Sequence, residues 1–368
     1  MATQLQTPKR IVHVSPILFG KAGAIGGGER YPLELARAMA ERTPTALVCF
    51  GASRYAEKAG KLQIEVIPNW VNCGLFRFDP FNPFLLGFLS KADIIHCHQS
   101  RTMMSSLALL YGRASGRPVF TTHLGGGGFG MYGLLSGLYD GRLHISAYSR
   151  SLFGHDDPAR DKVIFGGVDA NKYRPNPAAE STGEVLYVGR LLPHKGINYL
   201  IEAVDETTVL RIIGRPGGPW RNAERYYSLL LELAKGRPVA FQTDATDADI
   251  VQACQRSLCI VLPSVYTDVY GGCSQVPELL GLTAIEGMAC GLPAIVTDVA
   301  SLPEVVEDGV TGFVVKPNNP AALAEKIYWL RTNPAAARKM GVAARQRVLK
   351  LFTWERVVDR CLQAYGLS

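Results

Sequence analysis

The stretch EVLYVGRLLPHKGINYLIEAV, residues 184–204, decides the fold. Residues 184–190 form a short apolar run typical of a buried strand, and residues 197–204 have the apolar spacing of a helix. Strands that are apolar throughout and separated by helices indicate a parallel sheet covered on both faces. Ligands of such sheets bind beyond the carboxyl ends of the strands, so the loop carrying Arg190 and Lys195 is where we expect chemistry.

The same alternation continues outward in both directions. Towards the C-terminus, it predicts strands over 209–214, 238–242, 258–264, 293–298 and 312–316, with helices over 224–235, 248–256, 282–291 and 320–331. Towards the N-terminus, it predicts strands over 11–17, 46–50, 64–68, 93–98, 118–123 and 143–147, with a helix over 29–42. The chain is therefore predicted to be an α/β protein with two successive doubly wound, Rossmann-like domains.

The length and composition agree with this organisation. The chain has 368 residues, of which 47% are apolar and 19% charged, enough for two domains with their own cores. We expect a first domain over 1–165, a Pro- and Gly-rich linker over 166–183, a second domain over 184–352 and an amphipathic helix over 353–368. No apolar run is long enough to span a membrane, and the first residues lack the apolar stretch of a signal peptide.

The charge is distributed unevenly. Residues 1–165 hold 18 Lys and Arg against 11 Asp and Glu, whereas residues 166–368 hold 21 of each, so the net charge of +7 lies in the first part. Such an excess attracts an anionic acceptor or an anionic membrane surface, although an ordinary solvated surface explains it equally well. Nucleic acid is not expected as a partner, because no basic run is interleaved with aromatic residues.

Two histidines and eight scattered cysteines were considered as metal ligands. The cysteines form no CxxC pair and are interpreted as free thiols in a reducing cytoplasm. His96, Cys97 and His98 follow an apolar run. Because successive residues of a strand point to opposite faces, these three side chains are not expected to converge on one metal ion.

Glycine-rich turns follow two of the strands in the first domain. Gly26, Gly27 and Gly28 stand directly before the first helix, where backbone N–H groups can approach an anion. A formal GxGxxG begins at Gly125, but the second strand lacks the acidic residue that a dinucleotide fold needs there, which disfavours NAD. His123, next to this second turn, is expected to point into the site.

The second domain contains two glutamates eight residues apart, Glu278 and Glu286. Between them, a predicted helix starts with Gly281, Leu282 and Thr283. This order allows one carboxylate to hold sugar hydroxyls and the other a ribose, while the helix N-terminus faces phosphate. Asp247 and Asp249 spell DxD, but they open a helix, where aspartate is expected as a cap or first-turn anion rather than a metal ligand.

Taken together, these motifs resemble the retaining glycosyltransferases of the GT-B fold, in particular glycosyltransferase family 4. The resemblance is carried by GGGE at 26–29, DIIHCH at 93–98, GGVDANKYRP at 166–175, VGRLLPHKG at 188–196, the Glu-x7-Glu segment and PEVVEDGVTGFVV at 303–315. It implies two Rossmann-like domains facing a central cleft, with the first domain binding the acceptor and the second the nucleotide-sugar donor. It also implies that the C-terminal helix crosses back to the first domain.

The resemblance assigns roles to the site residues. Arg190 and Lys195 would neutralise the donor diphosphate as the sugar leaves. Glu278 would hold the transferred sugar and Glu286 the nucleoside ribose. The N–H groups of residues 281–283 would meet the distal phosphate. In the first domain, Gly27 or Gly28 would approach the diphosphate and His123 would lie near the sugar and the acceptor.

The implied reaction is transfer of a sugar from a UDP- or GDP-sugar to a sugar or lipid-linked hydroxyl acceptor, with retention at the anomeric carbon and with no metal or other cofactor. A role in bacterial surface polysaccharide or glycolipid assembly is expected, in the cytoplasm or at the cytoplasmic face of the membrane. Thr243 stands where family members usually have Gly, and the stretch 266–276 is longer than the common pattern. A nucleotide-sugar epimerase, a Rossmann oxidoreductase and an inactive sugar-nucleotide-binding protein are the alternatives.

Overall fold

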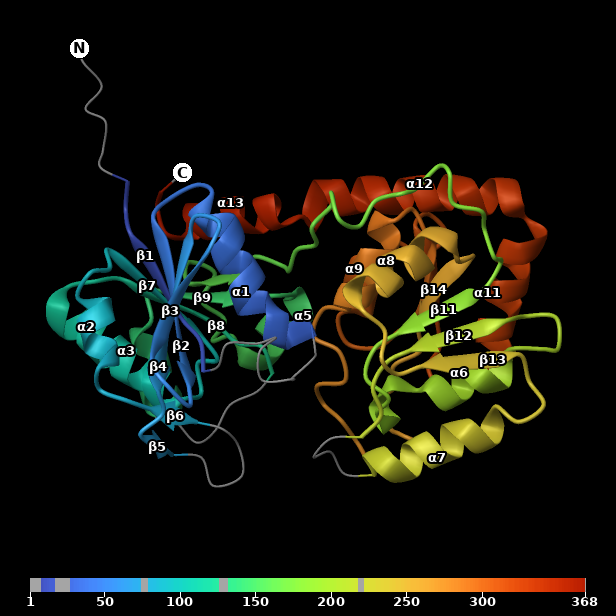
Figure 1. Ribbon diagram of the computed structural model, residues 1–368, viewed down its shortest axis with the longest axis horizontal. Helices are drawn as coiled ribbons and strands as arrows, with labels where there is room; N and C mark the ends of the chain where they lie inside the picture. The colour runs from blue at the N-terminus through green and yellow to red at the C-terminus, as the bar shows by residue number, and fades with distance from the viewer. Residues whose placement is uncertain (1–7, 17–26, 74–78, 126–131, 218–221, 368) are drawn as a thin grey trace, which may run out of the picture. The chain divides into compact units, whose positions relative to one another are not determined.

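The computed structural model describes residues 8–16, 27–73, 79–125, 132–217 and 222–367. The chain divides into two compact units. The first comprises Met1–Phe165 together with Trp354–Ser368, and the second comprises Gly166–Thr353. Each unit contains one main sheet with helices packed on it (Figure 1). In the part of the chain that the structure describes, no helix is both long and apolar enough to cross a bilayer.

The main sheet of the first unit is parallel except at one edge. Its strand order is β10-β9-β8-β7-β1-β2-β4-β3, and only β3 runs antiparallel to its neighbour. The strands are β1 (Ile11–Val14), β2 (Thr45–Gly51), β3 (Tyr55–Ala59), β4 (Leu62–Pro68), β7 (Ile94–His98), β8 (Val119–Thr122), β9 (Gly141–His144) and β10 (Asp161–Val163). The helices are α1 (Gly27–Ala40), α2 (Leu85–Leu89), α3 (Met103–Ser115), α4 (Tyr132–Leu135), α5 (Ala147–Phe153) and α13 (Trp354–Ala364). A separate hairpin pairs β5 (Val71–Asn72) with β6 (Pro80–Phe81).

The second unit has a fully parallel sheet in the order β13-β12-β11-β14-β15-β16. The strands are β11 (Val185–Val188), β12 (Leu210–Ile213), β13 (Val239–Gln242), β14 (Cys259–Leu262), β15 (Ala294–Thr297) and β16 (Gly312–Val315). The helices are α6 (Ile197–Ala203), α7 (Ala223–Leu233), α8 (Asp247–Arg256), α9 (Leu282–Ala289), α10 (Leu302–Val305), α11 (Pro320–Thr332) and α12 (Pro334–Leu351).

The central strands explain why the apolar runs predict this architecture. Every residue of β1, β7, β8, β11, β14 and β15 is buried, as expected when helices cover both faces of a parallel sheet. The predicted α/β fold class with two doubly wound units is confirmed.

The segment 166–183, interpreted from its composition as a linker, packs on the second unit. Tyr173 is buried, and its carbonyl accepts a hydrogen bond of 3.1 Å from Arg345 of α12. Lys172 forms an ion pair of 2.7 Å with Asp247, the first residue of α8. Backbone carbonyls and charged side chains of this segment thus bond to α8 and α12. These polar contacts hold the segment on the second unit although it has few apolar residues.

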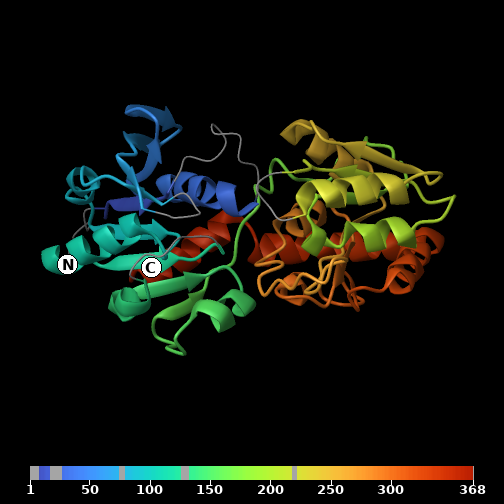
Figure 2. The ribbon, with the colours of Figure 1, turned by 90° about the horizontal axis from the view of Figure 1, so that it is seen from below.

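Helix α13 belongs to the first unit and packs against α1 (Figures 1 and 2). The hydroxyl of Tyr365, the residue directly after α13, lies 2.6 Å from Nδ1 of His96, and Nε2 of His96 lies 2.8 Å from the Thr122 hydroxyl. His13 Nδ1 and His98 Nε2 are 3.0 Å apart on the same face of the sheet. Three fully buried histidines therefore form one cluster on this face of the sheet.

Burial keeps these three histidines neutral. Burial lowers the pKa of His13 to about 3. It lowers the pKa of His96 and His98 well below the usual range, with further lowering by the neighbouring histidines. Among the described residues, no carboxylate pairs with these histidines, so the folded unit disfavours a proton on them.

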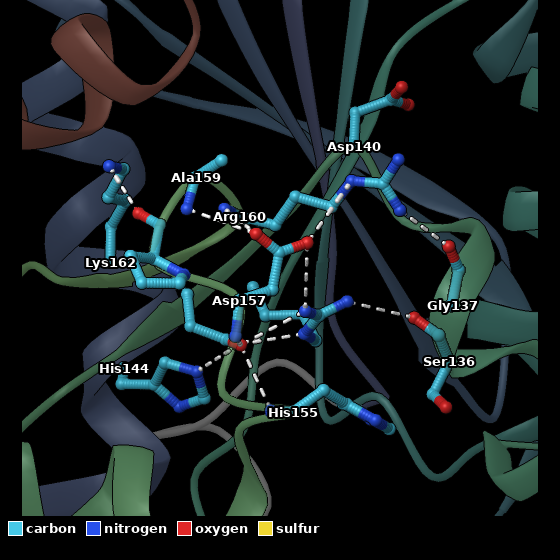
Figure 3. Close-up of polar contacts among 12 residues, drawn as sticks. Ser136, Gly137, Asp140, His144, His155, Asp157, Ala159, Arg160 and Lys162 are labelled. Atoms are coloured by element: carbon cyan, nitrogen blue, oxygen red, sulfur yellow. Dashed lines mark hydrogen bonds and ion pairs between the residues drawn. The ribbon is translucent and has the colours of Figure 1, made fainter.

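A second polar cluster lies at the β9–β10 edge of the same sheet (Figure 3). Asp161 accepts from Arg142 through Nε at 2.7 Å and Nη2 at 3.0 Å, and from His144 Nε2 at 3.0 Å. The N–H groups of His155 and Asp157 also donate to it. Burial alone would raise the pKa of Asp161, but these hydrogen bonds outweigh burial and hold its pKa below the usual range. The cluster joins the last strand to its neighbour.

We predict that the first unit loses stability in mild acid. Below the unfolded pKa of about 6.5, the unfolded chain binds protons that the folded unit excludes, so the free energy of unfolding falls by about 1.4 kcal/mol per pH unit for each such histidine. The stability is complete above this pH and declines towards about pH 3. Urea unfolding between about pH 7.5 and about pH 5.5 measures the slope. His13→Gln removes one of these histidines, so the slope of the unfolding free energy against pH should become smaller by up to about 1.4 kcal/mol per pH unit. An unchanged slope would contradict the prediction.

We further predict that Asp161→Asn destabilises the first unit by about 3–5 kcal/mol, because it removes the buried carboxylate that pairs with the Arg142 cation, whose other acidic partner, Asp157, lies 4.0 Å away. The matched control is Asp298→Asn, which removes one partner of the exposed Asp298–Lys316 pair and should cost less than about 1 kcal/mol. Urea unfolding of each variant measures both values. Equal effects of the two substitutions would show that the Asp161 cluster does not stabilise the sheet edge.

Candidate functional site

The site in the second unit lies where the chain order of its strands reverses. β11 pairs with β12 on one side and with β14 on the other, so the loops after β11 and β14 emerge side by side at the carboxyl edge. The two loops touch, because Val265 N–H donates to the His194 carbonyl at 2.9 Å. Gly196 adopts φ +64°, and a Cβ there would lie 2.1 Å from the Pro263 carbonyl oxygen. Glycine is therefore required for this close approach.

Lys195 and Glu278 come together at this edge. The Lys195 ammonium lies 2.6 Å from Glu278 Oε2 and donates to the Pro277 carbonyl at 3.1 Å. The two side chains are only 13% and 18% exposed. They are 83 positions apart in the sequence, so the parallel fold brings together two residues that the sequence assigned to one site. The pair therefore places a cation and a carboxylate beside the loops that follow β11 and β14.

The N-terminus of α9 contributes the third element of the site. Gly281 is the N-cap residue, with φ +84°, and a Cβ there would lie 2.7 Å from Leu302 Cδ2. Leu282 and Thr283 are the first two helical residues, where backbone N–H groups and the helix dipole favour an anion. Glu286 lies one turn further along α9 and is partly exposed.

The loop after β11 carries positive charge. Arg190 is partly exposed, and its carbonyl accepts a hydrogen bond of 3.0 Å from the buried Tyr187 hydroxyl. Burial, with the charges of Lys195 and Arg190, lowers the pKa of His194 to about 3, so this histidine is neutral at pH 7. Sequence analysis did not single out His194, although its position between the two cations was visible. The loop thus offers two cations to an anionic ligand.

His123 lies at the carboxyl edge of the first unit, directly after β8. Its Nδ1 is 3.1 Å from the Ser100 hydroxyl, and its ring meets Phe153 edge to face with centroids 4.2 Å apart. Burial first, then the charges of Arg101 and His144, lower the pKa of His123 to about 3. His123 is therefore a neutral hydrogen-bonding group there. The contacts of His123 with Ser100 and Phe153 could not be predicted from the sequence, because both residues belong to other segments of the chain.

The glycine turns are only partly described. Gly27 and Gly28 are the first two residues of α1, as a helix N-terminus near an anion requires. Gly26, Gly127 and Gly130 lie outside the described residues. The segment 266–276 forms a compact turn in which Thr267 bridges Cys273 and the Asp268 carboxylate accepts from Tyr270 and Gly272 N–H groups.

Two groups of side chains in the structure have the composition of metal ligands. Asp249 closes a capping box with Thr246 at the start of α8, which confirms the capping interpretation of the DxD sequence. His13, His96 and His98 offer nitrogens within 4.8 Å of one another. A metal on the facing nitrogens of His13 and His98 would leave hydrogens on His13 Nε2 and His98 Nδ1, which have no partner among the described residues. Among the described residues, His13 and His98 therefore lack the outer acceptors that support metal-bound histidines.

Comparison with known proteins identifies the family on both units. The family described as "Glycosyltransferase Family 4" matches residues 25–170, and "Glycosyl transferases group 1" matches residues 169–347. The fold resembles sucrose-phosphate synthase from Thermosynechococcus elongatus, with a TM-score of 0.72, 20% identity, and coverage of 97% of this chain and 98% of that one. It also resembles Anabaena HepE in complex with UDP and glucose, with a TM-score of 0.72, 16% identity, and coverage of 97% and 99%.

Curated relatives match a shorter part of the chain. Alpha-maltose-1-phosphate synthase of Mycolicibacterium smegmatis is 29% identical over 233 residues, covering 57% of each chain. D-inositol 3-phosphate glycosyltransferase of Streptomyces bingchenggensis is 27% identical over 231 residues, covering 57% of this chain and 48% of that protein. The chain thus spans about half the length of the curated relatives it matches. Because the two family matches together run from residue 25 to residue 347 on a fold shared by solved glycosyltransferases, the chain belongs to the family 4 type of GT-B glycosyltransferases.

Proposed function

We propose that the protein is a retaining, metal-independent glycosyltransferase that moves a sugar from a UDP- or GDP-sugar to a hydroxyl acceptor. The observation that carries this proposal is the Lys195–Glu278 pair, 2.6 Å apart beside the N-terminus of α9. A cation, a carboxylate and a helix N-terminus at one edge are complementary to a diphosphate joined to a sugar. The solved complex of Anabaena HepE with UDP and glucose supports a donor of this class.

The charges explain how such a donor would be held. Without a ligand, the Lys195 ammonium is neutralised by Glu278. A diphosphate would draw the ammonium towards its oxygens and release the carboxylate to accept hydrogen bonds from sugar hydroxyls. Arg190 would add a planar, bidentate contact to phosphate, and Glu286 would hold the ribose. The ammonium then keeps an anionic partner, and the released carboxylate is stabilised by charge-assisted hydrogen bonds from the sugar hydroxyls.

The same residues account for the proposed reaction. The bond between the anomeric carbon and the diphosphate oxygen breaks while the acceptor oxygen bonds to that carbon on the same face, and the acceptor proton passes to the leaving phosphate. Negative charge grows on the leaving group, where Lys195, Arg190 and the α9 N–H groups would stabilise it. This front-face reaction needs no protein nucleophile. It also suits His123, whose depressed pKa makes it a neutral partner for a hydroxyl.

The acceptor is proposed to be a sugar or a lipid-linked glycan of a bacterial surface polysaccharide or glycolipid, modified at the cytoplasmic face of the membrane. Support comes from the charge of the first unit, whose residues 1–165 carry the net +7 of the chain. An anionic acceptor would be attracted to that unit. The names of the two curated relatives also refer to phosphate-bearing sugars or polyols.

The donor class is tested by incubating the purified protein with UDP- and GDP-sugars, with and without a glycan acceptor. We expect nucleoside diphosphate release to depend on the acceptor, and the anomeric proton of the product to show the donor configuration by NMR. A donor should also raise the melting temperature by mass action. Interconversion of the donor sugar without transfer would indicate an epimerase, and an inverted product would overturn the retaining mechanism.

We predict that Lys195→Ala and Glu278→Ala each lower kcat/KM by about 10²–10³, the usual cost of removing one group that stabilises developing charge or positions the sugar. Lys316→Ala is the matched control, because Lys316 forms an exposed pair with Asp298 in the same unit and should leave kcat/KM unchanged. Steady-state transfer kinetics measure all three variants. Near-normal turnover of both site variants would contradict the assignment.

A further inference from the structure

The first unit exposes an aromatic patch beside its small β5–β6 hairpin, whose two strands are labelled in Figure 1. The patch consists of Trp70, Val71 and Phe84, whose side chains are 55%, 55% and 62% exposed. The two rings contact each other edge to face, with centroids 5.0 Å apart and planes at 74°. Large apolar side chains gathered on a surface usually mark an interaction site.

The backbone beneath the patch is held firmly by polar side chains. The hydrogen bonds run from Phe81 N to Asn69 Oδ1 at 3.2 Å, from Asn82 Nδ2 to the Pro68 carbonyl at 2.8 Å, from Phe84 N to Asn82 Oδ1 at 2.9 Å and from Met103 N to Asp79 Oδ1 at 2.9 Å. Asp79 and Asn82 are each only 1% exposed. Two buried polar side chains thus fix the hairpin to the end of β4 and the start of α3. The aromatic side chains are presented outward by a fixed backbone.

The surroundings of the patch carry positive charge. Arg54 is exposed in the turn after β2, and that turn is joined to the hairpin by the bond from Asn69 N to the Gly51 carbonyl at 2.9 Å. Arg101 is exposed two residues before the start of α3, whose first residue Met103 is bonded to Asp79 next to β6. Among the described residues from 69 to 91, no exposed carboxylate occurs, since Asp79 is buried. The exposed residues of this described stretch are apolar, neutral polar or basic, which suits an anionic surface.

We infer that the aromatic patch docks the first unit on an anionic lipid surface. Tryptophan and phenylalanine side chains insert at the boundary between headgroups and acyl chains, and basic residues are attracted to anionic headgroups. Rings crossing at 74° do not form the flat shelf on which a sugar ring would stack. A second copy of the chain is disfavoured because it would bring two units of net +7 together. The inference names the residues through which the protein would contact the membrane proposed above. It does not depend on the proposed transfer reaction.

The test is co-sedimentation of the full chain with vesicles of phosphatidylcholine alone or mixed with phosphatidylglycerol. We expect binding to the anionic vesicles only, weakening as salt is raised because screening reduces electrostatic attraction. The double variant Trp70→Ala/Phe84→Ala should bind at least about tenfold more weakly. Tyr328→Ala is the matched control, since Tyr328 is an aromatic residue 60% exposed on α11 of the second unit and should leave binding unchanged.

Fluorescence provides a second readout that does not depend on loss of binding. Anionic vesicles should shift the tryptophan emission of the native chain to shorter wavelength, and Trp70→Phe should abolish that shift while binding persists. Equal vesicle binding by the native chain and the double variant would overturn the inference. Absence of binding to anionic vesicles by the native chain would also overturn it. If the double variant changed only self-association, or only binding of a soluble glycan, the patch would have a different partner and the inference would be wrong.

Discussion

The parallel pairing of β11 with both β12 and β14 is the constraint on which the candidate donor site depends. Because every strand of this sheet runs in the same direction, each loop that follows a strand emerges at one edge. The chain order reverses between β11 and β14, and such a reversal is where parallel sheets leave room for a ligand beyond their strands. Lys195 follows one strand and Glu278 follows the other, which is how an interval of 83 positions becomes a contact of 2.6 Å.

The glycines near this edge serve the same constraint. At Gly196, a Cβ would meet the Pro263 carbonyl, and at Gly281 it would meet a side chain of α10. Both residues also adopt positive φ, which other residues tolerate poorly. The loops can therefore come close enough for the Lys195–Glu278 pair to form without distorting the sheet. Backbone geometry and site chemistry are set by the same few residues.

The positions of the proposed donor residues on the loop after β11 and at the start of α9 could be predicted because their signal is local. Arg190 and Lys195 stand on one short loop, and Gly281 and Glu286 belong to one helix start, so spacing along the chain already indicated their arrangement. The fold class was accessible for a similar reason, since buried parallel strands are continuous apolar runs. Such features need no knowledge of which strand lies beside which.

The features that sequence analysis missed depend on contacts between distant elements. The antiparallel strand β3 and the β5–β6 hairpin are short and partly exposed, so they have no apolar run to reveal them. As expected from the sequence, Cys97 lies on the opposite face of β7 from His96 and His98. The position of His13 beside His96 follows from the register of β1 with β7, which spacing along the chain does not reveal. The Arg142–Asp161 pair likewise requires the β9–β10 pairing.

Burial also determines how the charge of the first unit responds to its surroundings. Burial lowers the pKa of His13, His96 and His98, as well as that of His123 and His144, below the usual range. Protonation of these five side chains therefore adds no charge to the folded unit near neutral pH, and its excess of cations comes from Lys and Arg. Attraction of this unit to an anionic acceptor or lipid should then vary with ionic strength far more than with pH, until acid unfolds the unit and the buried histidines take up protons together.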